Sequence, residues 1–509
     1  ETLQQHDIEL STATFDALDN ELQNIYAALT QPTEYLHVSW PAGDLAGSQL
    51  RPSFVVERIR RLFPSVPVTR ETGDYRLLTP AGALEAAGEH PGGALWQSFA
   101  QSGRWGAALE TMRRARSFDR GRLSPEAVRA LYGSSYRMSA SRMDKLRSCH
   151  FGYFMQYGLC AKERKAAGFD APEIGTFLHY LLENVNREVR ARGGYGAVER
   201  AALRGLVRQY LEKYSEEQLG GCREKSARFR YLFSRLRTTA YAIVENVADE
   251  LSQSDFVPLE FELGFGGRDG QLPAITIREG ESTLAVTGKV DRVDGWLRDG
   301  KLYIRVVDYK TGKKSFDLTD LRYGLGVQML LYLFALEGEG ERYFGRPVVP
   351  AGVLYTPARD VILRTERGAT EEKIRAALDK ELRRSGMVLA EPEVLQAMEH
   401  SALEKPCFLP IEVKKGGTIT GGLASAAQLG KLGQYVERLL HEITDELSSG
   451  NINADPCSRS PQESSCDWCE YASACCFEEG RDRRRMMKKV RDSEFWRFIE
   501  QETEEVRHG

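Results

Sequence analysis

The hydrophobic pattern of the chain changes at residue 257, from the repeat of helices to the alternation of strands. Residues 257–265, 274–278, 283–296 and 301–310 alternate apolar with polar side chains, and Gly and Asp residues lie at the turns between them. A period of two is typical of strands, so the four segments predict a meander. Helical patterns precede and follow it, and helices packed on one sheet form an α/β core. We therefore expect a mixed sheet flanked by helices, with large helical inserts.

The composition excludes several classes of protein. With 509 residues, of which 42% are hydrophobic and 28% charged, the chain is neither fibrous nor wholly disordered. Its longest apolar run, residues 329–336, is far shorter than the roughly 20 residues that span a bilayer. The residues that follow Glu1 do not have the basic and apolar pattern of a signal peptide, so we expect a fragment or a processed product rather than an export precursor. The chain has only nine cysteines, too few for a disulfide scaffold, which indicates a reducing cellular compartment. We therefore expect a cytoplasmic protein without membrane contact.

The net charge of −4 conceals two basic runs. Residues 101–150 hold eleven Lys or Arg against four Asp or Glu, and residues 481–491 hold seven basic residues against Asp482. Local patches govern phosphate binding more than the total charge does. Each run fits either a solvated helix face or a nucleic-acid contact, and its composition leaves both open.

Two acidic residues and a lysine lie on two successive segments of the strand block. Asp308 and Lys310 are two residues apart, so their side chains point to the same side of a strand. If the two strands pair as a hairpin turning at residues 299–300, Asp291 comes within reach of Asp308. Two carboxylates at one point repel unless a cation lies between them, and hard oxygen ligands select Mg²⁺ or Mn²⁺. A neighbouring lysine can then assist an attacking water and offset charge on a phosphate.

An Asp-x-Lys sequence alone also fits a surface ion pair, so its surroundings matter. Five short motifs follow one another in order: Gly-x-x-x-His, a strand Glu, Gly-x-x-Asp, Asp-Tyr-Lys and Gln-x-x-x-Tyr. They are formed by Gly175 with His179, Glu262, Gly288 with Asp291, Asp308 to Lys310, and Gln328 with Tyr332. This ordered set resembles the RecB-type nuclease domain of the PD-(D/E)xK superfamily.

The resemblance implies a role for each of these residues. The implied Mg²⁺ ligands are His179, Asp291, Asp308 and the backbone carbonyl of Tyr309. Lys310 would act on the attacking water, and Gln328 and Tyr332 would hold the DNA strand near the metal. Of the two glutamates on the preceding strand, Glu260 and Glu262, we prefer Glu262, in a supporting role.

A cysteine group follows the strand block. Cys466, Cys469 and Cys475 have the spacing of three metal ligands, whereas Cys476 adjoins Cys475 and can hardly reach the same site. Cys149 is the candidate for the fourth ligand, since it lies just before the nuclease core as the triplet lies just after it. Four cysteines suit zinc and an iron-sulfur cluster equally, so the spacing alone leaves both open.

The segments around these cysteines narrow the resemblance. A Ser-Ala-Ser…Cys-x-x-x-Tyr-Phe segment within residues 139–154 and the Cys-x-x-Cys-x₅-Cys triplet are similar to the C-terminal part of the AddB family, the nuclease subunits of bacterial AddAB helicase-nucleases. Residues 36–64, read as a short strand at 36–40 and a basic helix at 53–62, resemble the end of that family's helicase-like region. The family resemblance implies a [4Fe-4S] cluster on the four cysteines, which closes the nuclease domain on itself.

The resemblance also implies a domain organisation. The expected parts are the end of a helicase-like region (1–75), a helical basic connector (76–137), a RecB-type nuclease domain closed by the cluster (138–478) and a basic C-terminal tail (479–509). No Gly-x-x-x-x-Gly-Lys-[Ser/Thr] motif occurs, so we expect no ATP hydrolysis by this chain.

The implied function is that of a Mg²⁺-dependent single-stranded DNA exonuclease in a helicase-nuclease complex that resects double-strand DNA ends for recombinational repair. The expected partner is an AddA-type helicase-nuclease subunit, in a heterodimer. The expected DNA-binding residues are Lys313, Lys314, Arg228, Arg230 and Arg235. The alternatives are a stand-alone or CRISPR-associated iron-sulfur exonuclease and a catalytically dead module that binds DNA ends.

Overall fold

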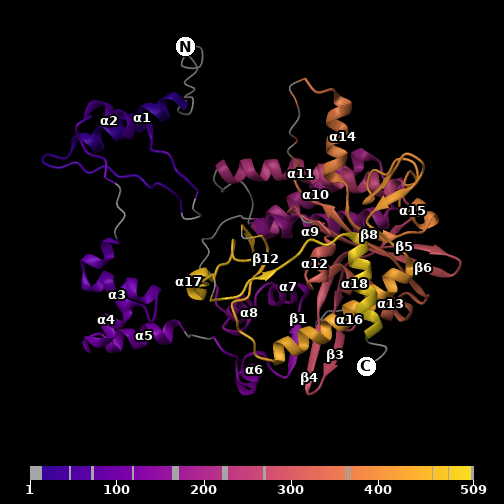
Figure 1. Cartoon of the computed structure of the whole chain (residues 1–509). Helices are drawn as coiled ribbons and strands as arrows, with labels where there is room; N and C mark the ends of the chain where they lie inside the picture. Colours follow the sequence, from indigo (N-terminus) through magenta and orange to yellow (C-terminus); the bar gives the residue numbers. More distant parts are fainter. Residues whose placement is uncertain are drawn as a thin grey trace, which may run out of the picture. The chain divides into compact units, whose positions relative to one another are not determined.

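A computed structural model gives the fold of most of the chain (Figure 1). It describes residues 14–44, 48–69, 74–116, 120–162, 171–219, 227–266, 271–313, 315–361, 363, 366, 368–460, 462–479 and 481–505.

The chain forms two compact units, residues 1–118 and 119–509. The four-part division expected from the sequence stays a prediction. Among the described residues, no helix is both long and apolar enough to cross a membrane.

The first unit is helical in its described part. Its helices are α1 (Thr14–Thr30), α2 (Phe54–Leu62), the short 3₁₀ helix η2 (Tyr75–Leu78), α3 (Pro80–Glu89), α4 (Ala94–Gln101) and α5 (Gly106–Arg116). The helix expected at 53–62 is confirmed as α2. The strand expected at 36–40 is wrong, because those residues are irregular. A strand needs a neighbour for its backbone hydrogen bonds, and the described part of this unit offers only an isolated bridge between Gly43 and Gln49.

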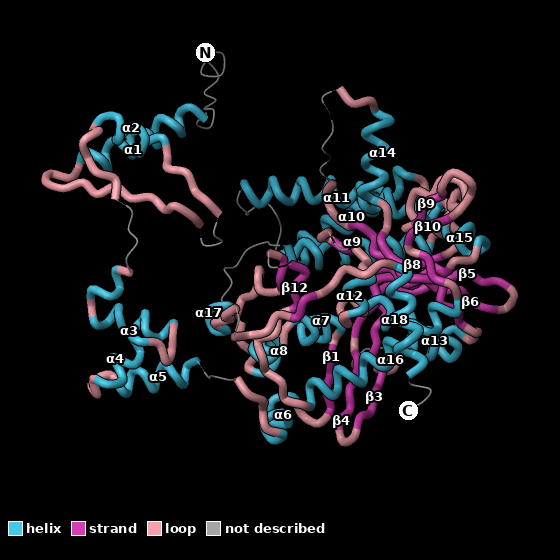
Figure 2. The backbone as a smooth tube through the Cα atoms, in the orientation of Figure 1, coloured by secondary structure: helices cyan, strands magenta, loops and turns pink. Residues whose placement is uncertain are grey.

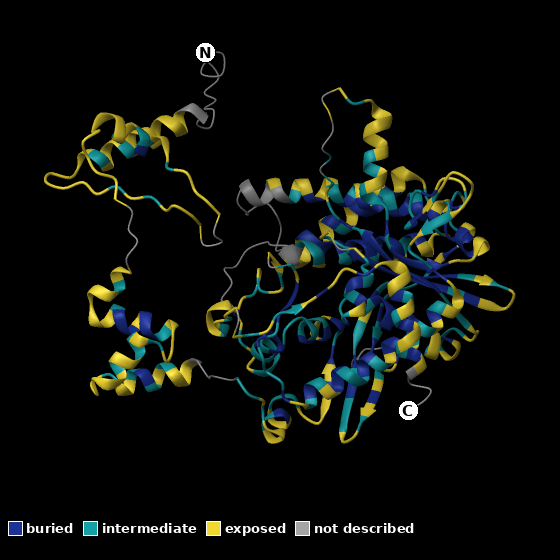
Figure 3. Cartoon of the chain, viewed as in Figure 1, coloured by how far each residue is buried: buried dark blue, intermediate teal, exposed yellow. Residues whose placement is uncertain are grey.

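A six-stranded mixed sheet forms the centre of the second unit (Figure 2). Its order is β11-β8-β7-β6-β5-β2, and only the β6–β7 and β8–β11 pairs are parallel. The strands are β2 (Val257–Phe265), β5 (Gly288–Arg298), β6 (Lys301–Lys310), β7 (Val348–Pro357), β8 (Ser385–Leu389) and β11 (Leu423–Ala424). Most of β6, β7 and β8 is buried (Figure 3). The expected mixed sheet flanked by helices is confirmed.

The expected four-strand meander is wrong, because two of its members belong to another sheet. β3 (Ile275–Glu279) and β4 (Ser282–Val286) pair with each other, and β4 pairs in parallel with β1 (Ser135–Met138). Thr287 separates β4 from β5, and its N–H donates to the Met138 carbonyl. The segment read as one strand over 283–296 therefore crosses from one sheet to the other.

Smaller strands complete the unit. They are β9 (Ile411–Val413) with β10 (Ile419–Gly421), and β12 (Cys457–Ser460) with β13 (Glu463–Ser464) and β14 (Arg485–Met486).

Helices flank the central sheet and carry part of the site. α9 (Ala171–Ala191) packs on β2, and α13 (Gln328–Phe344) packs on β6 and β7. Two separate helices follow β6, α12 (Leu318–Arg322) and α13, because Gly324 and Gly326 between them have φ of 73° and 68°. Such positive φ values leave the right-handed helix and favour glycine.

The remaining helices form the inserts and the ends of the unit. They are α6 (Pro125–Tyr132), α7 (Ala140–Ser148), α8 (His150–Tyr153), the π-helical turn η3 (Phe154–Gly158), the 3₁₀ turn η4 (Tyr195–Ala197), α10 (Arg200–Leu219), α11 (Ala227–Ser252), α14 (Glu371–Leu382), α15 (Pro392–Met398), α16 (Ala426–Ser448), α17 (Ala472–Cys475) and α18 (Asp492–Glu505).

Candidate active site and cysteine group

The register of the β5–β6 hairpin places the two predicted aspartates opposite each other. Arg292 pairs with Val307, and one step further along the antiparallel ladder Asp291 faces Asp308. Asp308 is buried, and its pKa is raised to about 6 by burial and by the neighbouring charge of Asp291, against the opposing effect of Lys310. The structure thus brings together the two carboxylates that the sequence predicted to meet.

Lys310 lies beside Asp308, as the two-residue spacing predicted. Its Nζ is 2.5 Å from Asp308 Oδ2 and 5.5 Å from the centre of the Tyr355 ring. About a quarter of the Lys310 side chain is exposed. The ammonium group is therefore fixed next to the acids while one side of it stays open to solvent.

His179 reaches the same point from α9. Its Nδ1 lies 3.3 Å from Asp291 Oδ1 and 3.8 Å from Glu262 Oε1. Burial disfavours the charged imidazole, but hydrogen bonds and charge attraction from Asp291 and Glu262 outweigh this and raise the pKa of His179 to about 10. A cleft of about 490 Å³ opens here, lined by Gly175, Thr176, His179, Tyr180, Glu183 and Glu262.

The two glutamates of β2 contact different partners, although regular alternation would put them on one side. Glu262 has a φ of 54°, and its Oε2 lies 2.9 Å from the Nζ of Lys289. Glu260 Oε1 instead accepts a hydrogen bond of 3.2 Å from Tyr343. The departure of Glu262 from extended geometry separates the pair, and Glu262 is the one that lies at the site. Sequence reasoning did not single out Lys289.

Tyr309 contributes to the site through its backbone. Its N–H donates to Asp291 Oδ2 at 2.7 Å, which fixes the orientation of that carboxylate. Its buried ring meets the His179 ring edge-on with 6.3 Å between centroids, and its hydroxyl accepts hydrogen bonds from Arg292 and Asn186 at 2.9 and 3.3 Å. The metal contact expected of its carbonyl stays a prediction.

Gln328 and Tyr332 lie on one face of α13, as their spacing predicted. The two side chains are hydrogen-bonded, and Tyr332 also hydrogen-bonds the Lys289 backbone. The Tyr332 ring stacks on Phe265 with 5.5 Å between centroids. It lies close enough to the two aspartates for their charges to raise the pKa of its hydroxyl, although burial is the larger cause.

A buried ionic network lies next to the site, and sequence reasoning missed it. Its members are Glu250, Arg292, Asp294, Arg305 and Arg384, all less than 3% exposed. Glu250 accepts from Arg384 at 2.6 Å, and Asp294 accepts from Arg305 at 2.8 Å. No local pattern could reveal it, because its members come from β5, β6, α11 and the end of the α14–β8 connection.

The cysteine group joins residues that are more than three hundred positions apart. Burial raises the pKa of the Cys149 thiol to about 11, and the negative charge of a Cys475 thiolate adds to this rise. Burial also raises the pKa of Cys475, with further contributions from Cys466 and Cys469. Cys149 and the triplet thus lie close enough for their charges to interact, and their binding of one metal centre stays a prediction.

Several hydrogen bonds hold the two segments of this group to each other. The His150 N–H and Phe151 N–H donate to Asp455 Oδ1 and the Asn453 carbonyl at 3.0 and 2.9 Å. Arg120 donates to the Cys475 carbonyl at 2.6 Å. Cys476 is exposed and bonds the Ser473 carbonyl.

The remaining described cysteines differ in exposure. Cys160 and Cys476 are exposed, Cys407 is half-buried and Cys457 is buried. Cys222 lies outside the described residues.

The predicted DNA-binding residues can be placed only in part. Lys313 lies just beyond β6 and is largely exposed. Arg235 pairs with Asp360 at 2.8 Å on the surface. Lys314 lies outside the described residues, and so do the side chains of Arg228 and Arg230.

The donor set of the first site fits a hard divalent cation. One ligand atom each of His179, Glu262 and Asp291 lies within 4.8 Å of the others, and Asp308 adds a third carboxylate beside them. Carboxylate oxygens and an imidazole suit Mg²⁺ or Mn²⁺. Burial and then the charge of Asp291 raise the pKa of Asp308, and Asp291 and Glu262 raise that of His179. A bound cation would neutralise this carboxylate charge.

The four thiols are spread more widely. Among the described cysteines, no three sulfur atoms lie within 4.8 Å of one another. Four thiolates are the donor set of both a tetrahedral zinc site and a [4Fe-4S] cluster, and these residues fit either.

Comparison with known proteins places this geometry in a family. The model of the PD-(D/E)XK nuclease superfamily matches residues 137–476, a range that includes every residue of the acidic site and all four cysteines. PD-(D/E)XK nucleases use divalent metals, in agreement with the donor set.

Similar proteins carry the name of an ATP-dependent helicase/deoxyribonuclease subunit. That of Acetivibrio thermocellus is 31% identical over 98% of this chain and 46% of its own length. Those of Clostridium acetobutylicum and Caldanaerobacter subterraneus are 29% and 30% identical over 99% and 98% of this chain, and over 46% and 45% of their own lengths. The chain spans about half the length of these relatives, and the resemblance expected from its motifs is confirmed. By the match over residues 137–476, the chain belongs to the PD-(D/E)XK nuclease superfamily.

Proposed function

We propose that the chain is a divalent-metal-dependent deoxyribonuclease that cleaves single-stranded DNA as part of a larger helicase-nuclease. The observation that carries the proposal is the convergence of His179, Glu262 and Asp291 within 4.8 Å, beside the ion pair of Asp308 and Lys310. These groups come from three strands and a helix, and the match to a nuclease family covers all of them.

The acidic residues hold the metal in this proposal. Asp291 and Asp308 supply oxygen ligands, His179 supplies a nitrogen and Glu262 supports them. When bound, Mg²⁺ or Mn²⁺ would lower the pKa of water and withdraw charge from the phosphate. The Tyr309 N–H keeps one Asp291 oxygen occupied, which orients the other oxygen towards His179 and the cleft.

The other side chains act on the substrate. Lys310 is placed to orient the attacking water and to stabilise negative charge that develops on the phosphate. Gln328 and Tyr332 are placed to hold the DNA strand near the metal. Their mutual hydrogen bond and the stack on Phe265 fix their positions before substrate arrives.

The four cysteines hold a [4Fe-4S] cluster in this proposal. The electrostatic proximity of Cys149 to the triplet supports it, since four thiolates are the donor set of such a cluster. The cluster would tie the segment before the nuclease core to the segment after it, as a structural link.

The substrate and partner follow from the relatives' name. Those proteins are subunits of an ATP-dependent helicase/deoxyribonuclease, so we infer that the present chain acts on DNA unwound by such a complex and assembles with its AddA-type helicase subunit. The role in resecting double-strand ends for recombinational repair belongs to the same proposal.

Degradation of end-labelled single-stranded DNA by the anaerobically purified 509-residue chain tests the nuclease proposal. The Asp308→Asn variant keeps the shape of the side chain but loses its charge, so we expect a loss of Mg²⁺-dependent cleavage of about 100-fold or more, with an unchanged iron content. Asp299→Asn, in the exposed turn of the same hairpin, should cleave as the wild type does.

Equal cleavage by the Asp308→Asn variant would contradict the proposed site. A wild-type chain that binds DNA and leaves it uncut, both alone and with the helicase subunit, would contradict the proposed activity and favour a DNA-binding module.

A further inference from the structure

A second pocket adjoins the proposed catalytic lysine, Lys310. It has a volume of about 280 Å³ and is formed by the ends of β6, β7 and α14 and the start of β8. The residues that line it include Lys310, Lys313, Tyr355, Arg359, Glu381 and Arg383. Lys310 therefore faces two spaces, the acidic site and this pocket.

The sheet topology explains why the pocket meets the site. β6 and β7 are parallel, so their carboxyl ends lie at the same edge, with Lys310 paired to Pro357. The Ala358 N–H donates to the Lys310 carbonyl at 2.8 Å, which fixes the chain just before Arg359. β8 runs the opposite way and begins at this edge, where Ser385 pairs with Tyr355.

Basic side chains outnumber acidic ones in the lining of the pocket. Four basic side chains line it, from Lys310, Lys313, Arg359 and Arg383, against the single carboxylate of Glu381. That carboxylate lies 2.8 Å from Arg359 Nη2 and 3.9 Å from Lys313 Nζ. Arg383 is turned away, towards Glu412 and the Pro406 carbonyl. An anion that enters the pocket would therefore meet Arg359 and Lys313 where Glu381 now lies.

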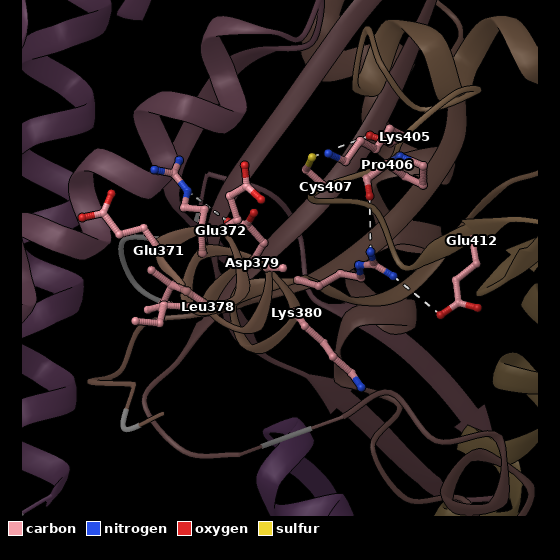
Figure 4. A pocket seen from close by; sticks show the side chains of 13 residues that line it. Glu371, Glu372, Leu378, Asp379, Lys380, Lys405, Pro406, Cys407 and Glu412 are labelled. Carbon is pink, nitrogen blue, oxygen red and sulfur yellow. Dashed lines mark hydrogen bonds and ion pairs between the residues drawn. The ribbon is translucent and has the colours of Figure 1, made fainter. Parts of the chain in front are cut away.

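A larger cleft on another side of α14 lacks this imbalance (Figure 4). Its volume is about 1150 Å³. Four basic and four acidic side chains line it, namely Arg375, Lys380, Arg383 and Lys405 with Glu371, Glu372, Asp379 and Glu412. A polyanion gains little there, because attraction and repulsion offset each other. The excess of basic side chains thus distinguishes the pocket beside Lys310 from this larger cleft, and size alone does not identify the nucleic-acid path.

We propose that Arg359 and Lys313 form a binding subsite for a backbone phosphate of single-stranded DNA, next to the phosphate that is cleaved, and that the Glu381 carboxylate occupies this subsite when DNA is absent. The inference rests on the proposed nuclease function and deepens it. Guanidinium groups bind phosphate oxygens in the same forked geometry as carboxylates, so the phosphate replaces Glu381 as the partner of Arg359. Such a subsite reads the backbone and is independent of base sequence.

The subsite predicts opposite effects for two neutral substitutions. Arg359→Gln removes a phosphate contact, so we expect the Kd for a fluorescent oligothymidylate to rise about 3- to 10-fold. The slope of log K against log salt should also fall by about 0.7, as for one contact to a single strand. Glu381→Gln removes the competing carboxylate and should lower the Kd. Arg375→Gln is the matched control, since Arg375 pairs with Asp379 on the same helix but lines only the balanced cleft and its rim.

Two assays on the 509-residue chain separate this inference from the proposed function. Fluorescence anisotropy in EDTA reports binding, and cleavage in Mg²⁺ reports catalysis. If Arg359→Gln and Glu381→Gln both bind DNA with the Kd and the salt slope of the wild type, the subsite is overturned, even if cleavage depends on Asp308. Weaker binding by Arg359→Gln and tighter binding by Glu381→Gln would support the subsite, even if the wild type leaves DNA uncut and the nuclease proposal fails.

Discussion

Gly288, at the start of β5, leaves the space that Tyr332 fills. A Cβ added there would lie 2.1 Å from the Tyr332 hydroxyl oxygen and 2.7 Å from two of its ring carbons. Real Cβ atoms do not approach other atoms so closely, so one of the two groups would have to move. The tyrosine is stacked on Phe265 and hydrogen-bonded to Gln328. The glycine of the Gly-x-x-Asp motif therefore leaves room for the Tyr332 side chain of α13 close to the two aspartates.

Gly288→Ala should impair both stability and cleavage. Overpacking of a well-filled site costs about 1–3 kcal/mol, and displacement of Tyr332 should lower kcat about tenfold or more. Thermal unfolding and the single-stranded DNA assay measure the two effects. Gly338→Ala is the control, since a Cβ there meets nothing within 4 Å and alanine favours a helix by up to about 1 kcal/mol. If Gly288→Ala melts and cleaves DNA as the wild type does, Tyr332 accommodates the added methyl group and the prediction is wrong.

At the scale of elements, the buried ionic network connects the sheet to α11. Glu250 on α11 accepts from Arg384 ahead of β8, and its Oε1 lies 3.4 Å from Arg292 on β5 and 3.2 Å from Arg305 on β6. The network therefore holds together the strands that carry Asp291 and Asp308. Removal of one partner from a buried charge group leaves the others uncompensated, which costs far more than the loss of an exposed pair.

Glu250→Gln should destabilise the protein by about 3–5 kcal/mol, measured as the free energy of unfolding in urea. Glu393→Gln, which removes an exposed partner of Arg298, should change it by less than about 1 kcal/mol. A cost as small as that of Glu393→Gln would mean that the three arginines find other partners.

The effect of Glu250→Gln on stability should depend on pH. Burial opposes the charge of Glu250, but Arg384, Arg292 and Arg305 outweigh it and lower its pKa from 4.5 to about 2. A carboxyl group whose pKa is lower in the folded state stabilises fully above its unfolded value and loses this effect as the pH falls through the folded value. The difference in the free energy of unfolding between the wild type and Glu250→Gln should therefore decrease as the pH falls from 4.5 towards about 2. A difference that stays constant over that range would contradict this account.

Local pattern predicted the elements of the site well and their long-range partners poorly. The alternation in β5 and β6 was enough to place Asp291 opposite Asp308, because a hairpin register depends on neighbours in sequence. The pairing of β4 with β1 joins residues almost 150 positions apart, and nothing local specifies it. The left-handed φ of Glu262 and the meeting of Arg359 with Glu381 depend likewise on the assembled fold.

At the scale of the molecule, the nuclease unit is closed by contacts between its two ends. Residues 149–151 bond residues 453–455, and Arg120 bonds the Cys475 carbonyl. Cys149 and Cys475 are 326 positions apart in the sequence. The proposed cluster would link the chain across this long segment and would restrict the unfolded chain by an amount comparable to the several kcal/mol of a disulfide that closes a long loop.

Cys149→Ser should therefore prevent binding of the proposed cluster and loosen the whole unit. We expect loss of the brown colour and of bound iron, a lower melting temperature and faster proteolysis of both ends of the unit, because three remaining cysteines leave one iron of the cluster without its thiolate. Cys476→Ser is the matched control, since Cys476 is exposed and adjoins Cys475, and it should keep iron and stability. Iron retained by Cys149→Ser, or zinc in place of iron in the anaerobically purified wild type, would contradict the proposed centre. An unchanged melting temperature after loss of iron would show that the hydrogen bonds between the two ends hold the unit closed without the cluster.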